Sequence, residues 1–244
     1  MSNQPLLGKS ALVTGGARRV GRELALTLAR AGADVTITYR TSHSEVAETV
    51  RSIEALGRRA LAVECDVRTE ASVRAAIAAS IASFGRLDVL VNNAAVFESA
   101  PLDQISLAEW DAVFETNARG PFLVAREALA SLRAVEGRIV NIGSLGGLCA
   151  WAGHAHYCAS KAALHSLTQS MAKAFAPQVS VNCVAPGWID LEGQPGDAAA
   201  HFAAKTPMQR NGTAEDVAQA VLFFAAGPRF VTGQVLAVDG GLGL

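Results

Sequence analysis

Short apolar runs and longer amphipathic segments alternate along the whole chain. The apolar runs predict buried strands at residues 10–14, 34–39, 59–64, 87–91, 137–142, 179–184 and 234–238. The amphipathic segments predict helices at residues 22–30, 44–56, 69–84, 106–132, 154–175 and 217–226. Because strands and helices alternate, the predicted class is α/β. We expect a single doubly wound Rossmann domain, with a seven-stranded parallel sheet flanked by helices on both faces.

Composition and charge narrow the range of partners. Half of the residues are apolar, which suffices for a core on both faces of a sheet, and the formal net charge is -1. No basic run stands out, so neither nucleic acid nor an anionic membrane is an expected partner. The longest apolar run, residues 220–226, is too short to span a membrane, and residues 1–5 do not resemble a signal peptide. A cytoplasmic protein is predicted.

The cysteines and histidines do not indicate a metal site. The four cysteines show no CxxC spacing and are expected to be reduced packing residues: Cys65, Cys149, Cys158 and Cys183. Three histidines, at positions 154, 156 and 165, flank the helix predicted at 154–175 but lack acidic or cysteine partners. Packing or solvent exposure is their expected role, and no metal is predicted.

A glycine-rich turn follows the first predicted strand and precedes the first helix. Backbone N–H groups at such a turn, together with the positive end of the helix dipole, form a phosphate site. Arg19 stands where the usual fingerprint has its middle glycine, and its guanidinium can pair with phosphate oxygens. The residues predicted to bind a nucleotide here are Gly15, Arg18, Arg19, Val20 and Gly21.

The end of the second strand indicates which nucleotide is bound. An acidic residue at this point holds the ribose 2′-hydroxyl of NAD, whereas an Arg accommodates the 2′-phosphate of NADP. Here Arg40 is followed by Thr41 and Ser42, while Asp34 lies at the opposite end of the strand. NADP(H) is therefore the predicted cofactor, with Arg18 as a second cation. The alternative is that Arg40 is a solvated loop residue.

The ends of the third and fourth strands extend this prediction. An aspartate after the third strand can accept a hydrogen bond from an adenine amino group, or else cap the next helix. Two asparagines after the fourth strand can bond to backbone and lock the sheet edge, and two alanines after them let a nucleotide pass close by. An ordinary Asx turn is the alternative. The residues predicted to contact the cofactor are Asp66, Val67, Asn93, Ala94 and Ala95.

Tyr157 and Lys161 carry the main catalytic signal. They are four residues apart in the predicted helix 154–175, so the phenol and the ammonium project from the same face. A fixed positive charge nearby lowers the pKa of a phenol. The pair can then act as a general acid/base toward a carbonyl oxygen near neutral pH. The alternative is a chance pairing of two residues on one helix.

Two further polar residues are candidates for the same chemistry. Ser144 follows the fifth strand, at the edge where ligands bind in open α/β sheets, and can donate a hydrogen bond to a substrate oxygen. Asn117 lies in the helix predicted at 106–132, just before Pro121. Pro121 is expected to bend this helix and free backbone carbonyls near Asn117 to hold a water.

These positions together resemble the short-chain dehydrogenase/reductase family, in its shorter single-domain branch. The matching positions keep the family's order over essentially the whole chain: Thr14-Gly15 to Gly21, Asp66, Asn92-Asn93-Ala94, Asn117, Ser144, Tyr157 with Lys161, Pro186-Gly187, and Val238-Asp239-Gly240-Gly241. The resemblance implies that Tyr157 donates the proton and that Lys161 lowers its pKa and holds the nicotinamide ribose. It implies that Ser144 positions the carbonyl and Asn117 maintains a water relay. It also implies nicotinamide contacts from Pro186, Gly187, Trp188 and Ile189.

The same resemblance divides the chain and implies an assembly. Approximately residues 8–95 form the cofactor-binding half and residues 96–244 the catalytic and substrate half. Residues 190–205 are predicted to be a lid over the substrate crevice, with a plain surface loop as the alternative. A homotetramer is implied, with a homodimer as the alternative. The apolar helix 217–226 beside an edge strand favours burial against another subunit.

The substrate is predicted only as a class. The chain is expected to transfer a hydride between NADPH and a carbonyl or imine-type substrate that contacts Phe97, Ser144 and Tyr157. The arginine pair of the turn, with Tyr39-Arg40, resembles the pteridine reductase branch, where an aromatic at the position of Phe97 stacks on the pterin. That branch often carries Asp in place of Ser144. A pterin, a 3-oxoacyl thioester and another ketone remain open as small-molecule substrates.

Two other functional classes use similar sequence features. A catalytically silent NADP-binding sensor needs the cofactor turn but not Ser144, Tyr157 and Lys161, all of which are present. A nucleotide-like binder such as a methyltransferase shares the glycine-rich turn. The Tyr/Lys pair and Arg40 argue against that second class.

Overall fold

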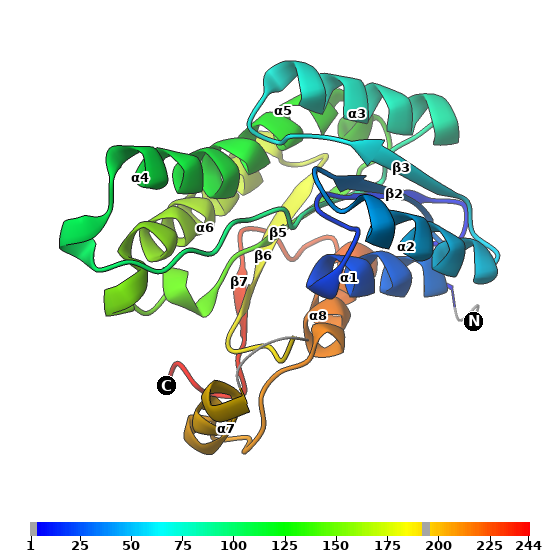
Figure 1. The fold of residues 1–244 in the computed structure, drawn as a ribbon. Helices are drawn as coiled ribbons and strands as arrows, with labels where there is room; N and C mark the ends of the chain where they lie inside the picture. Colours follow the sequence, from blue (N-terminus) through cyan, green and yellow to red (C-terminus); the bar gives the residue numbers. More distant parts are fainter. Residues whose placement is uncertain (1–3, 192–195) are drawn as a thin grey trace.

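A computed structural model describes residues 4–191 and 196–244 of the chain. At its centre lies a seven-stranded sheet, in which every pair of neighbouring strands is parallel, in the order β3-β2-β1-β4-β5-β6-β7 (Figure 1). The strands are β1 Ser10–Val13, β2 Asp34–Tyr39, β3 Ala60–Glu64, β4 Val89–Asn92, β5 Arg138–Ile142, β6 Ser180–Pro186 and β7 Val235–Val238. The predicted doubly wound fold is confirmed.

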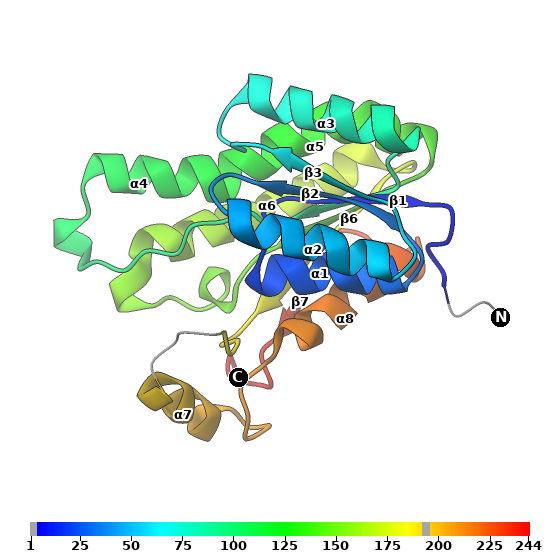
Figure 2. The ribbon, with the colours of Figure 1, turned by 45° about the vertical axis from the view of Figure 1, so that its right-hand side comes forward.

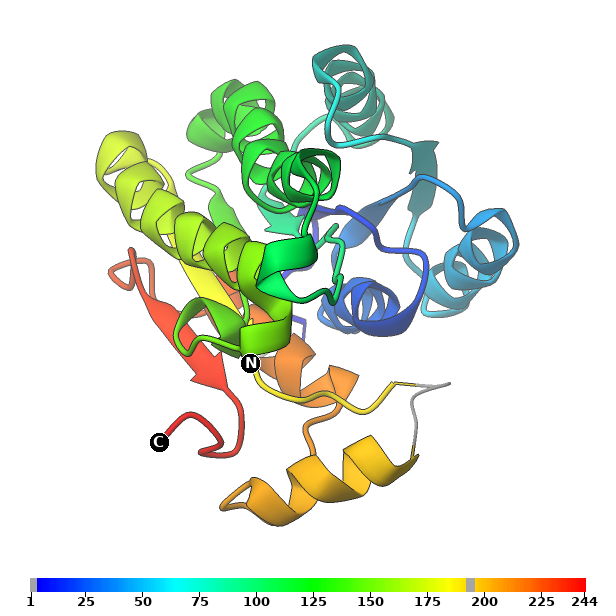
Figure 3. The same ribbon diagram turned by 60° about the vertical axis from the view of Figure 1, so that its left-hand side comes forward.

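Helices cover both faces of the sheet. Within the described residues they are α1 Arg19–Arg30, α2 His43–Ala55, α3 Glu70–Phe84, α4 Leu107–Phe114, α5 Gly120–Ala134, α6 Ala155–Phe175, α7 Gly196–Lys205 and α8 Ala214–Ala226. Helices α1, α2 and α8 lie on one face, and α3, α5 and α6 lie on the other (Figure 2). Helix α7 lies outside these two layers, at the end of the molecule where the C-terminus is found (Figure 3). No helix among residues 4–191 and 196–244 has the length and apolar character needed to cross a membrane.

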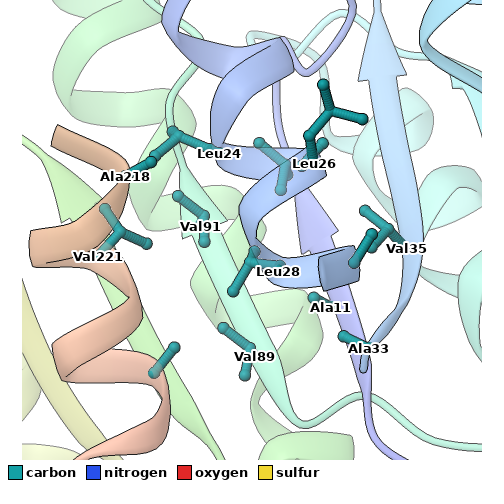
Figure 4. Packing of buried hydrophobic residues seen from close by; sticks show 14 of the residues in the cluster. Ala11, Leu24, Leu26, Leu28, Ala33, Val35, Val89, Val91, Ala218 and Val221 are labelled. Atoms are coloured by element: carbon teal, nitrogen blue, oxygen red, sulfur yellow. The ribbon is translucent and has the colours of Figure 1, made fainter. Parts of the chain in front are cut away.

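One core cluster joins α1 and α8 to the sheet. Leu24 and Leu28 of α1 pack with Val91 of β4 and Val221 of α8, and all four are at most 1% exposed (Figure 4). Strand residues are buried because helices cover both faces, which explains why the strands appear in the sequence as nearly continuous apolar runs. This packing holds α1 against the sheet. It therefore also positions the turn that connects β1 to α1.

The apolar surface of α8 is used within the chain. We expected it to be buried against another subunit, but its buried residues pack against α1 and the sheet in the same cluster. Burial of the remaining apolar surface against another subunit stays a prediction, because periodicity shows that a face is apolar without showing what covers it. Phe223 of α8 and Leu236 of β7 remain 49% and 41% exposed.

The helix predicted at residues 106–132 is divided in two. Helix α4 begins with the capping box of Ser106 and Glu109, and it runs into a π-helical turn at Glu115–Arg119 before α5 begins. Pro121 lies two residues after this turn in a continuous helical run, since Arg119 and Gly120 already have right-handed helical backbone angles, so its missing N–H leaves the preceding turn without one helical bond. The irregularity expected near Asn117 is therefore found there, as a π-helical turn. Single π-helical turns are frequent at functional sites.

The topology brings several strand ends to one edge. The chain order reverses between β1 and β4, and in such sheets ligands bind at the carboxyl ends of the strands at this point. Thr14, just after β1, joins the two strand ends, because its hydroxyl oxygen accepts hydrogen bonds from the N–H of Asn93 at 2.9 Å and of Ala94 at 3.0 Å. The side chain of Asn93 donates back to the carbonyls of Thr14 and Gly15. The predicted locking of the sheet edge by this asparagine is confirmed.

Replacing Thr14 by Val tests this junction. The two side chains have nearly the same shape, but Val leaves the N–H groups of Asn93 and Ala94 without their acceptor. We expect the free energy of unfolding, measured with urea, to fall by about 2–3 kcal/mol. Thr36→Val is the control, because within residues 4–191 and 196–244 the buried Thr36 hydroxyl shares one bond, with Ser80. Equal losses in the two variants would contradict the assigned role of Thr14.

Candidate active site

The predicted site residues surround one cavity. It has a volume of about 840 Å³ and lies along the carboxyl edge of the sheet. With the exception of Asn117, every residue that we predicted to bind cofactor or substrate, or to act in catalysis, lines this cavity. The sequence features therefore converge in space, although they come from positions 15 to 189.

The glycine-rich turn forms one end of the cavity. Gly15 has a φ of +63°, a backbone conformation that L side chains rarely adopt. A Cβ atom at Gly21 would overlap the carbonyl oxygen of Gly15 and approach the side chain of Asn93. Both positions therefore require glycine, which leaves backbone N–H groups at the start of α1 accessible from the cavity. The turn has the shape expected of a phosphate cradle.

Arg19 occupies an unusual backbone conformation in this turn. Its φ is +51°, in the left-handed region where a side chain with a Cβ costs about 1–2 kcal/mol. The side chain is exposed and lines the cavity. The turn thus keeps the backbone path of the usual glycine while adding a guanidinium at the cavity wall.

Two more arginines line the same end of the cavity. Arg40 and Arg18 are both exposed, and Arg18 Nη1 lies 3.7 Å from the carboxylate of Glu45. The positive charge of Arg40 also contributes to lowering the pKa of Asp66, so the two side chains are near each other. Three guanidinium groups around one end of a cavity attract an anion with more than one phosphate.

Asp66 is engaged by a neighbour that the sequence did not reveal. The guanidinium of Arg68 donates to both of its carboxylate oxygens, at 2.9 Å from Nε and 2.5 Å from Nη2. These bonds hold the pKa of Asp66 at about 2. Asp66 does not cap α3, whose cap position is Thr69. The carboxylate is therefore ionised and fixed at the cavity wall.

Asn117 ties the loop after β4 to the catalytic helix. Its side chain accepts from the N–H of Val96 at 2.9 Å and donates to the Val96 carbonyl at 3.0 Å. It also donates to the hydroxyl of Ser160, which in turn donates to the carbonyl of Tyr157. Asn117 is fully buried and does not line the cavity. Its visible role is to position Val96 and α6, and the predicted water relay stays a prediction.

Lys161 is a buried cation with one carbonyl partner. Its side chain is 3% exposed, and Nζ donates to the carbonyl oxygen of Ile142, the last residue of β5, at 2.8 Å. Burial lowers the pKa of Lys161 to about 8. The ammonium is therefore mostly protonated at pH 7 but sits close to its titration range.

Tyr157 lies beside Lys161, but its pKa moves opposite to our expectation. Burial raises the pKa of Tyr157, and a hydrogen bond with the Ser144 hydroxyl lowers it only in part. The expected lowering by Lys161 was wrong for this structure. Nζ of Lys161 lies 5.8 Å from the centre of the tyrosine ring and is directed to the Ile142 carbonyl. Tyr157 is accordingly a neutral phenol, which is the form that can give up a proton.

Ser144 sits on a tightly packed turn. Its hydroxyl oxygen accepts from the N–H of Gly146 at 3.0 Å, which leaves the hydroxyl hydrogen to donate toward Tyr157. Its own N–H points to Nε2 of His165 at 3.5 Å. Burial and the charge of Lys161 lower the pKa of His165 to about 4, so this imidazole is neutral at pH 7. His165 thus packs under the turn without adding a second charge.

Aromatic rings line the other end of the cavity. Phe97 is 57% exposed and stacks on His154, with ring centres 4.5 Å apart. Phe97 also meets Tyr157 edge to face, and Trp151 lies nearly parallel to Tyr157. Trp188 stacks on Phe202 of α7 in the same cavity. Residues 192–195 of the predicted lid lie outside the described residues.

Sequence reasoning missed several residues of this site. His154 precedes Tyr157 by three positions, at the end of the short 3-10 turn Ala152–His154 before α6, and this proximity in sequence could have indicated it. Trp151, in the irregular segment before α6, gave no signal. Leu242, in the C-terminal segment, also lines the cavity, held there by turns around Asp239. Among the described residues no group of His, Cys, Asp and Glu is arranged to hold a metal, and the four cysteines are free thiols.

Comparison with known proteins places this site in a family. Residues 15–243 match a family model described as "Enoyl-(Acyl carrier protein) reductase". The 3-oxoacyl-[acyl-carrier-protein] reductase FabG of Staphylococcus aureus is 37% identical over 240 residues, covering 96% of this chain and 98% of that protein. The cis-4-hydroxycyclohexanecarboxylate dehydrogenase of Sinomonas cyclohexanicum is 40% identical over 238 residues, covering 95% of both.

A solved structure gives the same result. A short-chain dehydrogenase from Burkholderia cenocepacia, in complex with NADP, is 41% identical to this chain, with a TM-score of 0.92. The alignment covers 98% of this chain and 100% of the other. Sequence and fold thus agree over nearly the full length, as the order of the site residues predicted. The chain belongs to the short-chain dehydrogenase/reductase family of oxidoreductases.

Proposed function

We propose that this chain is an NADP(H)-dependent reductase of carbonyl or imine-type substrates, with Tyr157 as the proton donor. The observation that carries the proposal is the convergence of the glycine-rich turn, Arg40 and the Ser144–Tyr157–Lys161 group on one cavity. The NADP complex of the Burkholderia relative supports the choice of cofactor.

The cavity fits the proposed cofactor along its length. The phosphates would lie over Gly15 and the start of α1, with Arg19 and Arg18 as partners. Arg40, Thr41 and Ser42 would hold the 2′-phosphate. Asp66 and Val67 would meet the adenine, and Asn93, Ala94 and Ala95 would border the path between the two ends. Lys161 and the segment of Pro186, Gly187, Trp188 and Ile189 would hold the nicotinamide ribose and ring.

The cofactor supplies a hydride when bound, and the chain's residues manage the proton and the geometry. Ser144 orients the substrate oxygen by donating its hydroxyl hydrogen. Tyr157, held neutral by burial, gives its phenolic proton to that oxygen as negative charge develops there. Lys161, whose ammonium is directed to the carbonyl of Ile142, would hold the nicotinamide ribose beside Tyr157. Asn117 holds Val96 close to α6 and contributes to the route by which Tyr157 is reprotonated.

The proposal extends to location and assembly. We propose a cytoplasmic protein without nucleic acid or membrane partners, in which residues 8–95 and 96–244 are the cofactor and substrate halves. We also propose a homotetramer, with a homodimer as the alternative. Support comes from large apolar side chains that stay exposed, such as Phe122 of α5 at 41% and Phe230 after α8 at 102%.

Removing the tyrosine hydroxyl tests the proton donor. In Tyr157→Phe the ring contacts with Phe97 and Trp151 can persist, but no proton is available. We expect kcat for carbonyl reduction to fall by about 10²–10⁴-fold. The dissociation constant of NADPH, measured by fluorescence titration, should change less than about threefold. Turnover within a few-fold of the original enzyme would contradict the role of Tyr157.

Replacing Lys161 by Met separates catalysis from stability. The pKa of Lys161 is about 8 in the folded chain, against an ordinary value of 10.5 for lysine, so the unfolded state binds more protons between these pH values. Burial of the ammonium therefore lowers the free energy of unfolding by its full amount below pH 8. This penalty diminishes as the pH rises to 10.5. The variant also loses the bond to Ile142, which offsets part of this gain. We expect its free energy of unfolding at pH 7 to be about 1–2 kcal/mol higher than that of the original protein.

The same Lys161→Met variant should lose most reductase activity while gaining this stability. Urea unfolding at pH 7 and at pH 10 measures the pH dependence, and the gain should shrink at the higher pH. A variant less stable than the original protein at pH 7 would show that the buried ammonium is not a net cost.

Arg40 is tested through cofactor choice. We expect Arg40→Ala to raise the dissociation constant of NADPH about tenfold or more, because a charge-assisted contact to phosphate is lost. NADH lacks the 2′-phosphate, so its dissociation constant should change less than about twofold. Arg51→Ala is the control, since Arg51 is exposed on α2 and does not line the cavity. An equal effect on both nucleotides would refute the assignment.

A further inference from the structure

Three aromatic rings enclose the proton donor at the substrate end of the cavity. The Phe97 ring stacks on His154 at 4.5 Å and 21°, and it meets the Tyr157 ring edge to face at 4.8 Å and 87°. The Trp151 ring lies nearly parallel to Tyr157, at 6.4 Å and 15°. The carbonyl of Glu98 lies 2.8 Å from Nδ1 of His154, so that nitrogen carries a hydrogen and the ring is held in place. These rings present flat apolar surfaces next to the reacting oxygen.

A second aromatic pair comes from a different part of the chain. Trp188, after β6, stacks on Phe202 of α7 with ring centres 4.1 Å apart and planes inclined by 14°. Both side chains line the same cavity as Phe97 and Trp151. Aromatic side chains offer a large contact area with little loss of conformational freedom, and they pair preferentially with other rings. The substrate end is therefore suited to a flat ring.

Fixed charge is confined to the rest of the cavity. Arg18, Arg19 and Arg40 lie at the end formed by the glycine-rich turn, and Lys161 is directed to the carbonyl of Ile142. Among the described residues lining the substrate end, the one lysine is Lys161, which is buried and bonded to the Ile142 carbonyl, and no arginine accompanies the aromatic rings. A carboxylate or phosphate next to the substrate carbonyl would lose its hydration there without gaining a counter-charge. The polar edge of a pterin would likewise find few partners among these rings.

We infer that this site reduces uncharged ketones that carry an aromatic ring next to the carbonyl. The inference rests on the proposed function and narrows its substrate class. The carbonyl carbon receives a hydride from NADPH, which is oxidised to NADP⁺, and the π bond of the carbonyl opens. The oxygen receives the phenolic proton of Tyr157, and the product is a secondary alcohol. The ring lies against Phe97 and the other aromatic side chains.

Three matched carbonyl compounds separate the effect of the ring from the effect of charge. NADPH consumption is followed with ethyl benzoylformate, which has the ring and no charge, with benzoylformate, which has the ring and a carboxylate, and with ethyl pyruvate, which has neither. We expect kcat/KM for ethyl benzoylformate to exceed each of the others about tenfold or more. An acetoacetyl thioester and a 7,8-dihydropterin are assayed in parallel.

The outcomes distinguish this inference from the proposed function. Equal or faster turnover of ethyl pyruvate overturns the argument for an aromatic ring. Equal or faster turnover of benzoylformate overturns the argument for an uncharged substrate. Either result leaves the reductase assignment unchanged. A preference for the thioester or the dihydropterin has the same consequence. No NADPH oxidation with any of the five compounds overturns the proposed function, and the inference with it.

A variant then assigns the preference to the ring cluster. Phe97→Leu keeps an apolar side chain but removes the ring, so kcat/KM for ethyl benzoylformate should fall about fivefold while that for ethyl pyruvate changes less than about twofold. Phe175→Leu is the control, because Phe175 is the last residue of α6 and does not line the cavity. Binding of NADPH to both variants, measured by titration, shows whether the fold is retained. Equal losses on the two esters would overturn the assignment to Phe97.

Discussion

The burial of the Lys161 ammonium against a single backbone carbonyl is the constraint on which the site depends. A buried cation is costly, and here its hydrogen-bond partner is the neutral oxygen of Ile142 at 2.8 Å. That oxygen points to α6 because β5 ends there and the chain turns at Gly143. A Cβ at Gly143 would overlap His165, so the turn, the helix and the strand fit together in only one arrangement.

A buried polar network holds the catalytic helix in that arrangement. Asn92 of β4 donates to Asn141 of β5 at 2.8 Å, and Asn141 donates to Thr168 of α6 at 2.8 Å. Asn117 reaches the same helix from the π-helical turn through Ser160. The phenol and the ammonium are therefore placed by bonds that cross strands and helices. Such networks specify a unique geometry because each unpaired member would be costly.

Much of the fold and part of the site could be predicted from the sequence, because local chemistry decided them. Alternating apolar runs gave seven strands, and Arg40 and the Tyr157–Lys161 spacing identified cavity residues. Other features depended on contacts between distant segments. The pKa of Tyr157 follows burial rather than its neighbour on the helix, Arg68 holds Asp66, and α8 packs on α1. The aromatic side chains that line the cavity come from segments between residues 97 and 202, which no local pattern could show.

The most direct test of this account is an NMR titration of Lys161. The chain contains four lysines, so Lys161→Met assigns the side-chain Cε signal of Lys161 by its disappearance from the spectrum. We predict that this signal titrates with a midpoint near pH 8, as burial of the ammonium requires. A midpoint near 10.5, the ordinary value for lysine, would mean that the ammonium is solvated. The site could not then be organised around a buried charge.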